Sequence, residues 1–159
     1  MKTFILFLRP YLLLLFIWTA ILHTQPLSAQ ASLGYYPFQS ELSITSNPNK
    51  ILWGDMRLLT NTFWGNITVE PALMVNVKRS KSVNYYTGIG VNCNFFNGFN
   101  DVSVINGYSL NFGARIKPIE NVPNLQCIFE IAPYMNQSFD GGLLKTRLGL
   151  AYHFKKRGE

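Results

Sequence analysis

The sequence predicts an all-β protein, an antiparallel up-and-down β-barrel of about eight strands. Three observations support this prediction. Apolar residues recur at every second position over stretches about ten residues long, which is the period of a strand. Short segments rich in Asn, Gly, Pro and Ser separate these stretches, and residues that favour helices are scarce beyond the N-terminal segment.

The N-terminal segment 1–31 has the pattern of a removable signal peptide. Two basic residues, Lys2 and Arg9, precede or interrupt a short apolar run, and small residues follow at 29–31, where we expect cleavage. The alternative is a single membrane anchor, because the apolar stretch 4–22 is nearly long enough to span a bilayer. No cysteine lies at the cleavage pattern, so we do not expect a lipoprotein anchor.

We expect one barrel domain over 32–154, followed by a short basic tail at 155–159. Removal of the signal would take two basic residues away and lower the net charge from +6 to +4. A nucleic-acid-binding chain would carry a basic face with interleaved aromatic residues inside the fold, and the sequence has no such face. We therefore expect no nucleic-acid partner and interpret the tail as a solvated end.

Seven segments alternate apolar and polar residues as strands do. They are 41–46, 51–62, 66–78, 83–95, 108–117, 125–136 and 144–154. Membrane barrels have even strand numbers, so we expect the eighth strand within 32–46, where two short strands would bend near Pro37. Pro71 and Pro133 lie inside two of the segments, and the missing N–H predicts a bulge at each.

The alternation fits two opposite arrangements. In a soluble barrel the apolar face fills the core, whereas in a membrane barrel it contacts lipid and the polar face lines the interior. Strands of about ten residues suit a tilted bilayer crossing better than a soluble sandwich. We therefore predict a transmembrane barrel.

Charged residues in the middle of the polar face support this interpretation. These are three acids and three bases: Asp55, Arg57, Glu70, Arg115, Glu130 and Arg147. We expect Arg57 opposite Glu70, and Glu130 diagonal to Arg115 and Arg147, in a lumen filled by paired charges. The alternative is an ordinary solvated strand face. Small residues on the same face would make room for long side chains and favour the lumen: Gly88, Gly90, Gly113, Gly149 and Ala151.

Aromatic residues gather near the strand ends. Those expected toward one end are Phe63, Trp64, Phe95, Phe96 and Tyr108, and those expected toward the other are Tyr85, Tyr152 and Phe154. Two such belts are typical of barrels that span the outer membrane.

The last predicted strand carries the motif Arg147-x-Gly149-x-x-Tyr152-x-Phe154. This motif resembles the C-terminal assembly signal of Gram-negative outer-membrane proteins, although that family usually ends on the aromatic residue and here 155–159 follow. The resemblance implies a small β-barrel in the cell outer membrane, inserted by the barrel-assembly machinery and surrounded by membrane lipid and lipopolysaccharide.

Few residues suggest catalysis or metal binding. Cys93 and Cys127 lie on the apolar face with one strand between them, so we expect two free, lipid-facing thiols about 9–10 Å apart, beyond disulfide reach. His153 has no Ser or Asp near it in the sequence, and no His, Cys, Asp or Glu residues have metal-ligand spacing. We therefore predict no enzyme activity, no cofactor and no metal site.

The expected function is a structural or surface-interaction role in the outer membrane. The connection 96–106 would face outward and contact a surface partner, or alternatively pack over the barrel mouth. A second hypothesis is a secreted, soluble, lipocalin-like barrel whose apolar ligand pocket would be lined by Tyr85, Ile89, Phe112, Phe129 and Leu150. A third is a narrow channel or a membrane-barrel enzyme.

Overall fold

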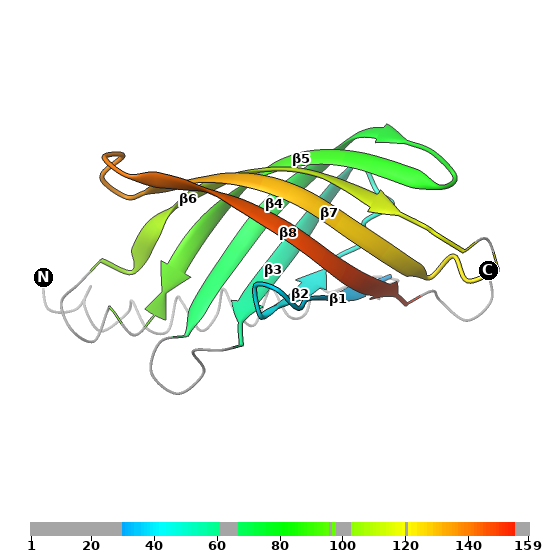
Figure 1. The fold of residues 1–159 in the computed structure, drawn as a ribbon, viewed down its shortest axis with the longest axis horizontal. Coiled ribbons are helices and arrows are strands. Elements are labelled where there is room, and N and C mark those ends of the chain that lie inside the picture. Colours follow the sequence, from blue (N-terminus) through cyan, green and yellow to red (C-terminus); the bar gives the residue numbers. More distant parts are fainter. Residues whose placement is uncertain (1–29, 61–66, 96, 98–102, 120, 155–159) are drawn as a thin grey trace, which may run out of the picture.

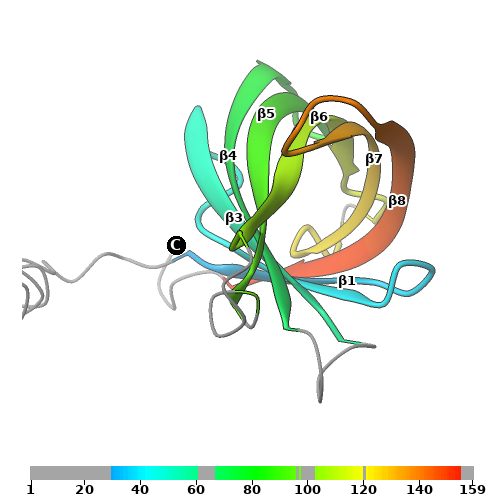
Figure 2. The same cartoon turned by 90° about the vertical axis from the view of Figure 1, so that its left-hand side faces the viewer.

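The structure is a computed structural model that describes residues 30–60, 67–95, 97, 103–119 and 121–154, and it forms an all-β barrel (Figure 1). Its strands are β1 (Ser32–Tyr36), β2 (Glu41–Thr45), β3 (Leu52–Leu59), β4 (Thr68–Arg79), β5 (Val83–Asn94), β6 (Ile105–Ile116), β7 (Leu125–Asn136) and β8 (Gly142–His153). Consecutive strands pair antiparallel, and β1 pairs with β8 to close the ring (Figure 2). The predicted eight-stranded up-and-down barrel is confirmed.

The two ends of the barrel differ in what they carry. We call the end where β1 begins and β8 ends the terminal end; it also holds the β2–β3, β4–β5 and β6–β7 connections. The opposite, loop end holds the other four connections. The predicted signal peptide, apart from its last two residues, and the basic tail lie outside the described residues. Within the described residues, no helix has the length and apolar character needed to cross a membrane.

The strands differ in length around the barrel. β4 to β8 have 12 residues each, β3 has eight, and β1 and β2 have five each. The two short strands on either side of Pro37 are those expected from the sequence. β1 pairs with β8 only from Ser32 to Tyr35, so the barrel wall is shorter along its axis at β1 and β2 than at the other strands (Figure 1).

The predicted bulges at Pro71 and Pro133 are absent, and that prediction was wrong. The register continues unchanged past both prolines, with Pro71 opposite Met56 and Pro133 opposite Leu144. Each proline removes a ladder hydrogen bond without adding a residue, so the pairing is interrupted but not shifted. The register shifts in the described strands lie between Asn76 and Lys78, and beside Asn92 and Cys93.

The apolar face of the sheet lies outside and the polar face lies inside. Outward residues such as Met56, Leu73 and Leu148 are about half exposed, whereas the charged residues between them are buried. The five side chains that a soluble barrel would use to line an apolar pocket all lie on the outer surface, with exposed fractions between 48% and 61%. They are Tyr85, Ile89, Phe112, Phe129 and Leu150.

Glycines in the lumen provide space for large side chains from neighbouring strands. A Cβ added at Gly149 would lie 2.6 Å from the ring of Tyr36, and one at Gly113 would collide with the ring of Tyr86. Tyr36 and Tyr86 are almost fully buried. A lumen this narrow holds an aromatic ring only where the neighbouring strand has a glycine beside it.

The two cysteines are free, as expected, but their predicted separation was wrong. Cys93 pairs with Ile105 and Cys127 pairs with Ile116, at opposite ends of β6. The rise of a strand places these two positions roughly 35 Å apart. The prediction of 9–10 Å counted the spacing between strands and ignored the position along them.

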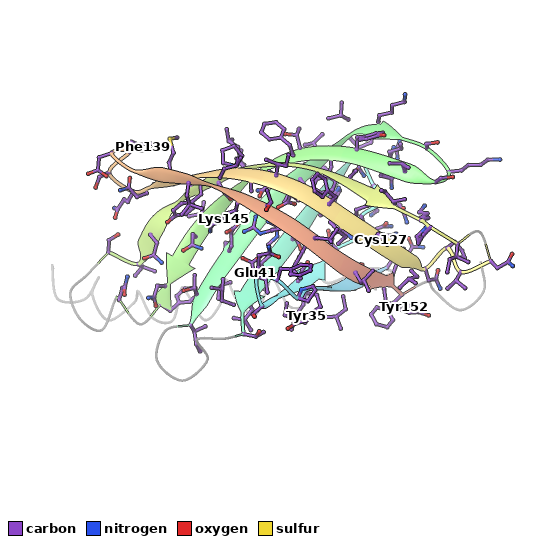
Figure 3. All side chains as sticks on the ribbon, in the orientation of Figure 1. Tyr35, Glu41, Cys127, Phe139, Lys145 and Tyr152 are labelled. Carbon is purple, nitrogen blue, oxygen red and sulfur yellow. The ribbon has the colours of Figure 1, made fainter. Side chains whose placement is uncertain are left out.

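Aromatic residues lie near both ends of the outer surface. At the loop end, Tyr108 stacks on Phe139 with a centroid distance of 5.6 Å. At the terminal end, Tyr152 and Phe154 meet edge to face at 5.2 Å. Figure 3 shows Phe139 and Tyr152 at opposite ends of the β7–β8 pair. Phe63, Trp64 and Phe96, which were expected in the same belts, lie outside the described residues.

Candidate functional site

The centre of the lumen holds an ion pair that spans it. Arg57 on β3 donates through Nη1 to Oε1 and through Nη2 to Oε2 of Glu130 on β7, both at 2.8 Å. β3 and β7 stand four strands apart in a ring of eight, so this pair connects opposite walls. Arg57 also contacts Asp55 at 2.9 Å and Glu70 at 3.3 Å. All four side chains are buried.

A second arginine completes the cluster. Arg147 on β8 contacts Glu41 at 2.8 Å, Glu130 at 3.0 Å and Glu70 at 3.0 Å. Glu70 and Glu130 each bridge both arginines, and the buried side-chain oxygen of Asn111 accepts from both at 3.2 and 3.3 Å. We call the set Glu41, Asp55, Arg57, Glu70, Glu130 and Arg147 the lumen cluster.

Hydroxyl groups also donate hydrogen bonds to three of the four carboxylates of the cluster. Ser43 and Thr45 donate to Asp55 at 2.5 and 3.0 Å. Ser109 donates to Glu70 at 3.0 Å, and the hydroxyl of Tyr86 donates to Glu130 at 2.8 Å. A buried charge is costly unless paired and hydrogen-bonded, and each carboxylate here has such partners.

Two further cations balance the charge of the lumen. The lumen cluster contains four carboxylates and two guanidinium groups. Lys145 lies 3.8 Å from Glu70 and over the ring of Tyr134, and buried Arg115 lies near the terminal end of β6. With these two included, positive and negative charges are equal.

The sequence placed Arg115 diagonal to Glu130, and the register confirms that position, but the side chain of Arg115 makes its contacts elsewhere. Arg115 donates to Thr45 at 3.1 Å and to Gln126 at 3.5 Å, and its guanidinium lies 4.7 Å from the centroid of the Trp53 ring. Its register partner on β7 is Ile128, two positions from Glu130. The guanidinium extends toward the terminal end and reaches Asp55 only through Thr45.

The other five predicted lumen residues meet in the lumen cluster, and Arg57 and Glu70 are register partners as expected. Glu130 and Arg147 were expected to be diagonal, and this was wrong, because they are direct register partners. Sequence reasoning missed Glu41 and Lys145. Glu41 begins a five-residue strand that is too short to show a clear period. Lys145 stands on the polar face, but its partner Glu70 is on β4, which is not adjacent to β8.

Aromatic rings close the lumen on the terminal side of the lumen cluster. Trp53 and Tyr86 meet edge to face at 5.2 Å, and Arg57 lies 5.9 Å from the centroid of the Tyr36 ring. Met74 and Ile128 fill the space between them and are fully buried. The lumen is thus packed with side chains at both levels.

The four residues of the predicted assembly motif divide between the two faces of β8. Arg147 and Gly149 point into the lumen, where one joins the lumen cluster and the other lies under Tyr36. Tyr152 and Phe154 lie outside and are about half exposed. Packing in the lumen therefore explains why an arginine stands at position 147 and a glycine at 149, without any recognition by assembly machinery.

The predicted contact loop is only partly described. Positions 96 and 98–102 lie outside the described residues, and the last two of 96–106 belong to β6. The described part is held by asparagine contacts at the loop end: Asn97 donates to Asn106 and Asn106 to Asn92, at 3.1 and 3.0 Å.

The described part of the chain does not bring three His, Cys, Asp or Glu side chains into an arrangement that could hold a metal ion. His153 lies buried at the terminal end, with its Nε2 3.3 Å from the side-chain nitrogen of Asn49. Comparison with known proteins gave no match to any family, to any curated protein or to any solved structure.

Proposed function

We propose that this chain is a small outer-membrane β-barrel protein with a structural or surface-interaction role. One observation carries the proposal: the barrel has an apolar exterior and a charged interior. In the part of the chain that the structure describes, 28 large apolar side chains are exposed, while Arg57, Arg115, Arg147, Glu70 and Glu130 are at most 1% exposed. A water-soluble barrel would gain free energy from the opposite arrangement.

The lumen supports a closed barrel and not a conducting one. Arg57 and Glu130 meet across it, and Arg147, Glu70 and Asn111 fill the same layer. An ion or solute would have to separate pairs whose partners are all buried, and breaking one such pair costs about 3–5 kcal/mol. A filled interior is usual in barrels of eight strands.

The proposed partners follow from the outer surface and the last strand. The apolar belt would contact membrane lipid, with lipopolysaccharide at the outer face, and the motif that ends in Tyr152 and Phe154 would engage the barrel-assembly machinery. The loop between β5 and β6 remains a candidate contact for a surface partner, since it lies at the loop end.

The test is expression of the full chain in a Gram-negative host, followed by fractionation and gel electrophoresis of unheated and boiled membranes. We expect the protein in the outer-membrane fraction, extracted only by detergent, with different migration before and after boiling. A soluble protein in the periplasm or medium, with no heat-dependent shift, would reject the proposal and favour a soluble ligand-binding barrel.

A further inference from the structure

Basic side chains are concentrated at the terminal end of the barrel. Five lie in or beside its turns: Lys50, Lys78, Arg79, Lys81 and Lys117. Within the described ranges none of them forms an ion pair. The described carboxylates lie elsewhere, four in the lumen cluster and Asp140 at the loop end. Glu120 also belongs to a terminal-end turn by sequence and lies outside the described residues.

Three of these cations line one hollow. It has a volume of about 780 Å³ and contains Lys78, Arg79 and Lys117 together with polar side chains and no carboxylate. Its other lining residues are Asn49, Ile51, Asn76, Val77, Ser80 and Asn84. Three cations that have no carboxylate partner among the described residues surround one concave space, and this favours an anion as the occupant.

The hollow has a floor that is fixed by buried contacts. The β2–β3 turn folds inward, Pro48 is fully buried, and buried Asn76 donates to the carbonyls of Pro48 and Lys50 at 2.8 and 2.5 Å. This holds Asn49 in the hollow, where its backbone oxygen accepts from Arg79 at 3.1 Å and its side-chain oxygen lies 3.5 Å from Lys117 Nζ.

The cations retain donors for a ligand. Arg79 uses one N–H on Asn49, and a guanidinium has five; Lys117 makes one long contact, and an ammonium has three donors. A phosphate group accepts several such charge-assisted hydrogen bonds at once, which makes it well suited to this set.

The rim of the hollow is apolar on the side of the outer surface. Val77 lies at the register shift of β4 and is 72% exposed, and Ile51 is 61% exposed. Val77 continues the outward face of Leu73 and Val75, and the register shift that follows places Arg79 opposite buried Asn84, at the hollow. A free inorganic anion would make no use of such a rim, whereas a lipid would place its headgroup on the cations and its acyl chains against the rim.

We propose that this hollow binds the phosphate headgroup of an anionic phospholipid. The inference rests on the proposed function, because a barrel in the membrane would carry this end at the level of lipid headgroups. Arg79 and Lys117 would hold the phosphate, and Ile51 and Val77 would contact the first part of the acyl chains.

The test uses the folded full-length mature chain in a neutral detergent and water-soluble short-chain lipids. Dihexanoyl-phosphatidylglycerol, dihexanoyl-phosphatidylcholine and inorganic phosphate are titrated separately and followed by native mass spectrometry. The variant is Arg79→Gln/Lys117→Gln. The control is Lys50→Gln/Lys81→Gln, which removes the same charge from the same end but spares the lining of the hollow.

We expect one phosphatidylglycerol per barrel, weaker binding of phosphatidylcholine, and a loss of affinity of roughly tenfold or more in the variant, since each cation near an anionic headgroup contributes about 1 kcal/mol. The control should bind as the parent does. If the double variant fails to fold, Lys117→Gln alone should fold and still weaken binding, because among the described residues its ammonium makes one hydrogen bond, which is 3.5 Å long.

Three results would overturn the inference. The variant and the control could lose the same affinity for phosphatidylglycerol, the two lipids could bind equally well, or inorganic phosphate could displace phosphatidylglycerol at the same concentration as the lipid. The last would identify a site for free anions. A soluble chain without a heat-dependent shift would instead overturn the proposed function. The two failures are distinguishable, because the short-chain lipids can be titrated against a soluble protein as well.

Discussion

Arg57 on β3 and Glu130 on β7 bind each other through two 2.8 Å contacts across the lumen, although 73 positions separate them in the sequence. Two parallel N–H···O bonds fix both distance and angle, so the pair sets the width of the barrel at this level. Arg147 shares Glu130 from a third wall at 3.0 Å. The lumen cluster thus connects five of the eight strands, β2, β3, β4, β7 and β8.

Removal of Glu130 should destabilise the barrel strongly. Glu130→Gln removes one of the two carboxylates that Arg57 and Arg147 share and leaves buried positive charge without its partner, which costs about 3–5 kcal/mol. The measurement is the urea midpoint of the folded, heat-shifted band. Asp140→Asn is the control, because Asp140 is an exposed carboxylate outside the lumen, and it should change stability by less than about 0.5 kcal/mol. Equal effects of the two substitutions would contradict the paired lumen.

The pair should also show coupling. Arg57→Met and Glu130→Gln together should lower the free energy of unfolding by less than the sum of the two single changes, by roughly 1–3 kcal/mol. Each single change leaves the other residue as a buried charge without its partner, whereas the double change removes both. A double-mutant cycle on the same urea midpoints measures this difference. Additive costs would mean that Arg57 and Glu130 act independently.

Gly149→Ala should impair packing of the lumen. The new Cβ would lie 2.6 Å from the Tyr36 ring and 2.8 Å from the Tyr35 carbonyl oxygen, and overpacking of this kind costs about 1–3 kcal/mol. Refolding of the purified chain into lipid vesicles measures the effect without assembly machinery. Gly141→Ala, in an exposed turn where the new Cβ would come no closer than 3.4 Å to the side chain of Asn136, should refold as the parent does. A normal yield for Gly149→Ala in vitro, with a defect only in cells, would assign Gly149 to recognition instead.

The seam between the first and last strands should accept a disulfide. A Cβ at Gly34 would lie 3.4 Å from the Cβ of Ala151, close to the spacing of about 3.5–4.5 Å found in disulfides. In a background without native cysteines, Gly34→Cys/Ala151→Cys should oxidise and raise stability by up to about 4 kcal/mol. Non-reducing gels of the folded form detect the bridge. Leu33→Cys/Ala151→Cys should stay reduced, since Leu33 points outside; a bridge there would contradict the register.

An arginine on the apolar belt should be costly only in a bilayer. Ile89 is 61% exposed in the middle of β5, and Ile89→Arg should cost about 2–4 kcal/mol in lipid vesicles because the charge would lie in hydrocarbon. Val122→Arg, in the β6–β7 connection, places the same charge at the interface and should cost less than about 1 kcal/mol. Vesicle refolding yields against urea compare the two. If the two substitutions destabilised the barrel equally, neither residue would lie in hydrocarbon and both would contact water.

The sequence predicted the features that depend on local period. β7 has the predicted bounds, β5 and β8 deviate by one or two residues at an end, and the inward face of every long strand follows from its alternation. Two-residue alternation identifies a face reliably because one shifted residue would exchange all side chains between lumen and exterior.

The contacts across the lumen could not be predicted in the same way. The Arg57–Glu130 pair depends on which strands stand opposite in the closed ring, and the position of Arg115 depends on the direction of a long side chain. The cysteine separation failed for a related reason, since stagger along β6 is set by the whole barrel and not by neighbouring residues. The shift at Val77 has no proline or glycine to mark it.

The central claim is that the apolar exterior lies in a membrane, and spin-label accessibility tests it most directly. A nitroxide at Ile89→Cys, in a background with Cys93 and Cys127 replaced by alanine, is compared in vesicles with a nitroxide at Ser138→Cys in the exposed β7–β8 turn. We expect oxygen to relax the Ile89 label more than a water-soluble nickel complex does, and the order to reverse at Ser138. Greater access of the nickel complex at both positions would contradict the claim.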